Sequence, residues 1–296
     1  MFWQLPAIRT APDIIFTIPG IHFPVSNTLL CTWITIILLV AFFYAGIRRK
    51  SLIPTGVQNA AEFVVEYLLG FVDSVVGGNK EKGKKFFPLV ATFFLFIIVA
   101  NLLDVIPGVD TVGAIDGEGI AKLHTTSQPV LGFLLFGNIS NQVIPWIRPA
   151  TSDLNLTLAM ALVSVITTQV FGFYTLGARE HLSKYFTFKS PIDFIVGLLE
   201  LISEFARVLS FAFRLFGNIF AGSAVLAVFA FLLPFVADIA FIPFELFVAF
   251  VQALVFALLT LVFLDMATTG HGHTDDEHLA HEIGQPAPEL ETSATK

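Results

Sequence analysis

Charged residues are scarce in this 296-residue chain. Asp, Glu, Lys and Arg make up 13% of it, whereas soluble globular domains carry about 25%. Hydrophobic residues make up 55% of the sequence, and 33 residues are phenylalanine. This composition excludes an ordinary soluble domain and indicates an integral membrane protein. No basic cluster in the sequence suggests binding to nucleic acid.

Cysteine is almost absent. Cys31 is the only one, which excludes an intramolecular disulfide and a metal cluster held by several thiolates. Because Cys31 lies in an apolar run, we interpret it as a packing residue. The N-terminus lacks the basic, apolar and small-residue regions of a cleaved signal peptide, so we expect an uncleaved end.

Long uncharged runs accompany this shortage of charge, and a helix needs about 20 apolar residues to cross a bilayer. We predict an all-α integral membrane protein with about five spanning helices, at 28–47, 86–108, 153–177, 191–233 and 244–268. The fourth exceeds the length of a perpendicular crossing, so it must tilt strongly or break. Pro234 and Pro243 are expected to bracket the turn between the last two helices.

Residues 54–77 have a different pattern. Apolar residues recur there at helical spacing, and Glu62, Glu66 and Asp73 mark the other side. Such a segment is too polar to span, and we predict an amphipathic helix at the membrane interface.

Lys and Arg are unevenly distributed among the connecting segments. The segments 48–50, 79–85 and 179–189 are basic and are predicted to be cytoplasmic, whereas 1–27, 109–149 and 234–243 are poor in bases and are predicted to lie outside. This places the N-terminus outside and the C-terminus inside.

Three regions follow from this pattern: an external N-terminal segment (1–27), a membrane domain (28–268) and an acidic cytoplasmic tail (269–296), predicted to be disordered. The tail contains four histidines that are a weak alternative as a metal site, and a solvated tail is the favoured interpretation: His271, His273, His278 and His281.

Polar residues follow one face of the 191–233 helix. They recur at steps of three and four, which keeps them on one side: Glu200, Ser203, Glu204, Arg207, Ser210, Arg214 and Asn218. The last helix carries Glu245, Gln252 and Thr260 at steps of seven and eight. We expect these two polar stripes to face each other across an aqueous or proton-relaying cleft.

Simpler interpretations exist for some of these residues. A role in packing or hydrogen bonding is equally compatible with the sequence for Ser203, Ser210 and Thr260. An ordinary ion-pair group is equally compatible with it for Glu200, Glu204 and Arg207.

Arg214 is different, because a guanidinium cannot lose its proton and costs about 2.5–3.5 kcal/mol at a bilayer centre on insertion scales. No acidic residue lies within one turn of it, so we expect its counter-charge to come from another chain.

Five blocks of sequence together resemble subunit a of F-type ATP synthases. The similarity covers roughly residues 25–268, and its blocks are "PTGVQNAAEFVVEYL", "FFPLVATFFLFIIVANLLDVIPG", "TSDLNLTLAMAL", "LSFAFRLFGNIFAG" and "FVQALVFALLTLVF". The resemblance implies a stator subunit whose two long C-terminal helices form a hairpin against a rotating ring of c subunits, each with a carboxylate at mid-membrane.

Arg214 matches the essential arginine of this family. The resemblance implies that it attracts the deprotonated ring carboxylate and separates an outer from an inner half-channel. Asn218 and Gln252 match polar residues that face this site. Glu200 and Ser210 match positions on the cytoplasmic side, and Arg207 matches a position that is often basic.

One pair of positions departs from some relatives, which carry glutamate at the position of Ser223 and histidine at that of Glu245. Here the acid lies on the last helix instead. We therefore expect Glu245 to serve the outer half-channel, with Ser223 hydrogen-bonding beside it.

The resemblance also implies partners and location. The partners are the c-subunit ring, b-type peripheral stalk subunits, the remainder of the complex and membrane lipid, in a bacterial plasma membrane. Either H+ or Na+ fits as the ion, and no cofactor or nucleic acid is implied. No nucleotide-binding motif is present, so we do not expect the chain alone to hydrolyse ATP.

Two other classes of function compete with this interpretation. A secondary transporter or ion channel with its own substrate site would show internal repeats or paired broken helices, and no convincing repeat is found. A purely structural scaffold would leave the two polar stripes unexplained.

The orientation can be tested with single cysteines at Thr10 and Thr292, in a background where Cys31→Ser removes the native thiol. An impermeant thiol reagent applied to sealed cells is expected to label position 10, and to label position 292 only after permeabilisation. Labelling of position 292 from outside would contradict the predicted orientation.

Overall fold

The computed structural model describes residues 12–18, 23–48, 54–106, 113–115, 143–177, 191–232 and 236–269. Within these ranges the chain forms six α-helices, one 3-10 turn and two short antiparallel hairpins. In chain order they are β1 Ile14–Ile18, β2 Phe23–Ser26, α1 Asn27–Arg48, α2 Val57–Val75, α3 Lys80–Val105, β3 Gly113–Ile115, β4 Val143–Pro145, η2 Ala150–Ser152, α5 Leu154–Leu176, α7 Pro191–Leu232 and α8 Val236–Thr268.

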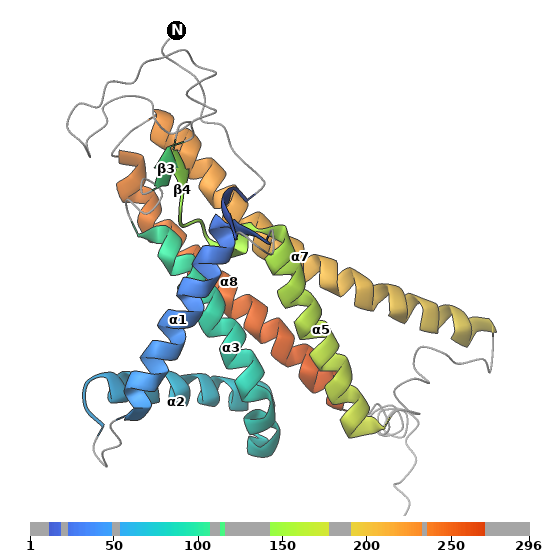
Figure 1. Ribbon diagram of the computed structural model, residues 1–296. Coiled ribbons are helices and arrows are strands. Elements are labelled where there is room, and N and C mark those ends of the chain that lie inside the picture. Colours follow the sequence, from blue (N-terminus) through green and yellow to red (C-terminus); the bar gives the residue numbers. More distant parts are fainter. Residues whose placement is uncertain are drawn as a thin grey trace, which may run out of the picture.

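The helices form an elongated bundle (Figure 1). α3 packs mainly on α8, and α5 packs on both α7 and α8. α2 lies crosswise at one end, beside the ends of α1 and α3, whereas the first half of α7 runs away from the bundle. α8 therefore lies at the centre of the bundle, in contact with α3, α5 and α7.

Four helices are long and apolar enough to cross a membrane among the described residues: α1, α3, α5 and the part of α8 from Phe241 to Thr268. The prediction of an all-α membrane protein is confirmed. The remaining predicted crossing, 191–233, corresponds to α7, which has 42 residues and carries the charged stripe. The crosswise path of α2 suits the interfacial helix predicted from its amphipathic pattern.

Local sequence explains the sharp turn between α2 and α3. Gly77 and Gly78 adopt positive φ values of 70° and 79°, which side chains other than glycine rarely tolerate. The Asn79 side chain then caps α3 by accepting hydrogen bonds from the backbone N–H groups of Glu81 and Lys82. This turn directs α3 back along the bundle.

Aromatic rings fill the space between α3, α5, α7 and α8. Phe256 of α8 contacts Phe93 of α3 and Phe211 of α7, with ring centroids 5.2 Å apart in both pairs. Phe171 of α5 meets Phe86 of α3 edge to face. In lipid, helices associate through such close packing rather than through the hydrophobic effect, so these contacts hold α8 in the centre.

The prediction for the turn between the last two helices is wrong in one respect. Pro243 does not end that turn but lies inside α8, which begins at Val236. A proline removes one helical hydrogen bond, and membrane helices tolerate this where neighbouring groups satisfy the backbone. Glu245 consequently lies on the third turn of α8 rather than at its start.

The start of α3 also differs from the prediction. The helix begins at Lys80 and contains Pro88, so the basic segment 79–85 forms its first turns. The hairpins β1–β2 and β3–β4 were not predicted. Of the connection 109–149, the structure describes only 113–115 and 143–149.

Candidate functional site

The polar stripes of α7 and α8 meet at one side-chain pair. Asn218 Nδ2 of α7 donates a hydrogen bond to Gln252 Oε1 of α8 over 2.9 Å. Gln252 is only 4% exposed, and its Nε2 is a buried donor without an acceptor in the described structure. An unsatisfied buried donor costs about 1–3 kcal/mol of folding free energy. This N–H group of Gln252 can therefore donate a hydrogen bond to a further acceptor at the seam between α7 and α8.

Arg214 lies one helical turn before Asn218, on the outer surface of the bundle. It is exposed, while the neighbouring Ala212 and Leu215 are completely buried on the packed side of α7. Within the described ranges the guanidinium has no hydrogen-bond, ion-pair or cation–π partner. The burial of one side of α7 therefore directs this charge away from the helices against which α7 packs.

Small residues surround Arg214 on the same surface. Ser210 and Ala221 are exposed, and a Cβ atom added at Gly217 would meet nothing within 4 Å. Small residues let a neighbouring helix approach closely in a membrane. This face of α7 can thus receive another helix with Arg214 at the contact.

Glu245 lies against α7 beyond the Asn218–Gln252 pair. Its Oε1 is 3.9 Å from the position that a Cβ of Gly222 would occupy. The adjacent Ser223 hydroxyl is within 3.1 Å of two carbonyl oxygens of its own helix, those of Ile219 and Phe220. Glu245 and Ser223 therefore flank the same stretch of the helix pair, and the serine proton is directed toward the backbone.

Toward the N-terminus of α7, Arg207 is held by two partners. Its Nη1 donates to both carboxylate oxygens of Glu204 at 2.9 Å, and its Cζ lies 3.9 Å from the ring centroid of Phe263 on α8. The ion-pair interpretation is confirmed for Glu204 and Arg207, whereas Glu200 takes no part in the pair. Sequence reasoning missed Phe263, although it follows Gln252 by eleven residues, or three turns of the same helix face.

The remaining predicted pathway residues of α7 make fewer side-chain interactions. Glu200 is half-buried and Ser210 is exposed, and neither side chain makes a hydrogen bond or ion pair with another described residue. Together with Arg207 they occupy the half of α7 that precedes Arg214.

Thr260 does not share the seam between α7 and α8, contrary to the predicted stripe. Its hydroxyl lies 2.9 Å from that of Ser164 on α5, and both residues are buried. Eight residues after Gln252, at 3.6 residues per turn, the side chain is rotated by about 80° around the helix. Thr260 therefore links α8 to α5.

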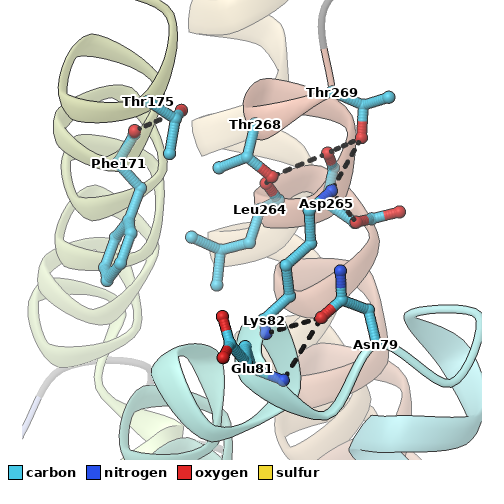
Figure 2. Close-up of polar contacts among 9 residues, drawn as sticks. All are labelled: Asn79, Glu81, Lys82, Phe171, Thr175, Leu264, Asp265, Thr268 and Thr269. Atoms are coloured by element: carbon cyan, nitrogen blue, oxygen red, sulfur yellow. Dashed lines mark hydrogen bonds and ion pairs between the residues drawn. The ribbon is translucent and has the colours of Figure 1, made fainter.

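An ion pair fastens the C-terminal end of α8 to the start of α3, as Figure 2 shows. Lys82 Nζ lies 3.5 Å from Asp265 Oδ1 and donates to Thr269 Oγ1 at 3.4 Å. Both charged side chains are about one-third exposed, and such pairs contribute about 0–1 kcal/mol. The contact sets the end of α8 without entering the α7 seam.

The structure contains no group of three or more His, Cys, Asp or Glu side chains arranged to hold a metal, within the part of the chain it describes. The four tail histidines lie outside that part.

Comparison with known proteins identifies the family. The sequence model described as ATP synthase A chain matches residues 29–265. The chain is 30% identical to ATP synthase subunit a of Moorella thermoacetica over 250 residues, covering 84% of this chain and 93% of that protein. The chain belongs to the ATP synthase A chain family.

Two further relatives agree with this assignment. ATP synthase subunit a of Desulforamulus reducens is 30% identical over 94% of this chain and 90% of its own length. ATP synthase subunit a 1 of Syntrophotalea carbinolica is 32% identical over 78% and 81%. ATP synthase subunit a is the proton-translocating stator of the membrane sector and not a catalytic subunit on its own.

The Arg207–Phe263 contact can be measured with a double-mutant cycle in the assembled complex. Phe263→Leu is expected to lower the thermal stability of the detergent-purified complex more in the wild-type background than in Arg207→Gln. The expected coupling free energy is about 0.5–2 kcal/mol, the range for cation–π contacts. Equal effects in both backgrounds would show that the contact contributes nothing, and Phe263→Tyr, which keeps an aromatic ring, is the matched control.

Proposed function

We propose that Arg214 is the charge at which this stator subunit meets the carboxylates of a rotating c-ring. The observation that carries the proposal is the exposed guanidinium on α7, without a partner in the described structure and one turn from the Asn218–Gln252 pair. An exposed cation among apolar side chains needs an anion from outside, and the small residues beside it leave room for a ring helix.

The proposed mechanism uses this charge as a barrier between two half-channels. A proton that crosses 100 mV yields about 2.3 kcal/mol, and this free energy is lost if the half-channels connect directly. A guanidinium stays charged throughout and repels a hydronium ion strongly in surroundings of low dielectric constant. Protons then cross only by riding on the ring carboxylates, which lose their proton before they pass Arg214.

The outer half-channel is assigned to residues on the C-terminal side of Arg214. Glu245 relays protons there. Asn218 and Gln252 provide polar groups along the route from Glu245 to the ring, and Ser223 forms hydrogen bonds beside Glu245. The position of the Glu245 carboxylate next to Gly222 supports this assignment, because it places a carboxylate close to α7 on the way toward Gln252.

The inner half-channel is assigned to the preceding half of α7. Glu200 is its acidic group, Ser210 lines the route toward Arg214, and Arg207 borders it. Since Glu204 and Phe263 already hold Arg207, Glu200 is left as the carboxylate that can exchange protons on this side. H+ is the ion that we assign, and Na+ remains compatible because the ring supplies the ion's ligands.

The chain works, in this proposal, with a c-subunit ring and b-type peripheral stalk subunits in a bacterial plasma membrane. The external segment is 1–27, the membrane domain is 28–268, and the tail 269–296 is cytoplasmic. The uneven distribution of Lys and Arg supports this orientation.

Arg214→Ala is expected to reduce ATP-driven proton pumping by membrane vesicles to background, while the complex still assembles. The physical reason is that the deprotonated ring carboxylate loses the permanent cation proposed to pair with it. Arg214→Lys keeps a positive charge, but a buried lysine can lose its proton. This variant is expected to pump at an intermediate rate or not at all. Normal pumping by Arg214→Ala would refute the assignment.

Glu245→Gln preserves size and hydrogen bonding but cannot relay a proton. We expect it to slow proton-driven ATP synthesis and to change its dependence on external pH. Glu81→Gln, an exposed carboxylate in the first turn of α3, is the matched control and should behave as wild type. If Glu245→Gln has a wild-type rate and pH profile, the outer route consists of Asn218, Gln252 and water alone.

A further inference from the structure

The crossing of α1 and α2 leaves a cavity of about 540 Å³ at the end of the bundle where α2 lies. A Cβ added at Gly46 of α1 would come within 2.8 Å of the Cβ of Ala61 on α2. Only glycine at position 46 allows this approach, so the two helices touch there and the cavity opens beside the contact. It lies apart from the α7–α8 seam.

The walls of this cavity differ in chemistry. Phe43 and Ile47 of α1 and Val65 of α2 form an apolar side, while Glu62 and Glu66 of α2 provide two carboxylates. Among the described residues that line it, none is a lysine or arginine. The cavity therefore combines an apolar wall with negative charge.

Both carboxylates are exposed on α2 and differ only in their protein partners. Gln58 Nε2 donates to Glu62 Oε1 at 2.8 Å, whereas Glu66 has no hydrogen bond or ion pair in the described structure. Carboxylates one turn apart on a helix repel each other, and ionised carboxylates only accept hydrogen bonds. A cation that donates several hydrogen bonds can pair with both carboxylates and offset their repulsion.

We propose that the cavity binds the headgroup of a phospholipid with a primary ammonium group, such as phosphatidylethanolamine. The ammonium donates N–H bonds to Glu62 and Glu66, and an acyl chain covers Phe43, Ile47 and Val65. Arg48 follows Ile47 at the end of α1, is exposed, and offers a cation for the lipid phosphate.

The position of α2 selects a lipid as the occupant. The helix lies crosswise to the spanning helices, so its carboxylates border the level at which headgroups meet acyl chains. A choline headgroup carries no N–H donor, and an anionic headgroup is repelled by both glutamates. The site consequently discriminates ethanolamine from choline and glycerol headgroups.

The test is native mass spectrometry of the detergent-purified ATP synthase complex, titrated with phosphatidylethanolamine, phosphatidylcholine or phosphatidylglycerol. Wild type is expected to retain phosphatidylethanolamine about three- to tenfold better than phosphatidylcholine, the range for charged hydrogen bonds at a partly open site. The double variant Glu62→Gln and Glu66→Gln should lose that preference, and Glu81→Gln should keep it.

A second variant separates the cavity from its charges. Val65→Trp fills the apolar side while leaving both carboxylates, and it is expected to reduce retention of phosphatidylethanolamine by a similar factor. Equal retention of the two lipids by wild type, or an unchanged preference in the double variant, would overturn the proposal. So would loss of a protein subunit from the double variant with lipid retention unchanged, because the cavity would then hold a protein.

Discussion

A guanidinium that cannot be neutralised, carried by an apolar helix and left without a partner in the described structure, is the constraint on which the rest of this structure depends. The insertion penalty of about 2.5–3.5 kcal/mol for such a charge is offset, in the proposed function, by repeated pairing with ring carboxylates. The direction in which the Arg214 side chain points matters for this pairing as much as its charge does. Phe211, Ala212 and Leu215 form the buried side of α7, and this packing keeps Arg214 on the outer surface.

The packing of α8 serves that arrangement. Aromatic contacts through Phe256 hold α8 between α3 and α7, and the Ser164–Thr260 contact ties it to α5. These contacts position Gln252 to accept the hydrogen bond from Asn218. On the other side of Arg214, Glu204 and Phe263 hold the second arginine of α7, so Arg214 is the one whose charge stays free for an outside anion.

Much of the fold followed from the sequence, because hydropathy and helical spacing are local signals. The mostly apolar run 191–233 predicted α7 nearly to the residue, and the amphipathic pattern of 54–77 predicted the helix α2. Prediction failed where contacts between distant segments decide the outcome. Pro243 is accommodated inside α8, Thr260 turns toward α5, and neither Phe263 nor the Lys82–Asp265 pair has a local signature that names its partner.

The most direct test of the account is passive proton flow through vesicles that contain the membrane sector without its catalytic sector, with the c-ring cross-linked to the stator. The account predicts that the cross-linked wild-type sector is proton-tight, because Arg214 separates the half-channels. It predicts a measurable leak for cross-linked Arg214→Ala, since the half-channels then connect without rotation. A cross-linked Arg214→Ala sector as tight as wild type would contradict the role of Arg214 as the barrier.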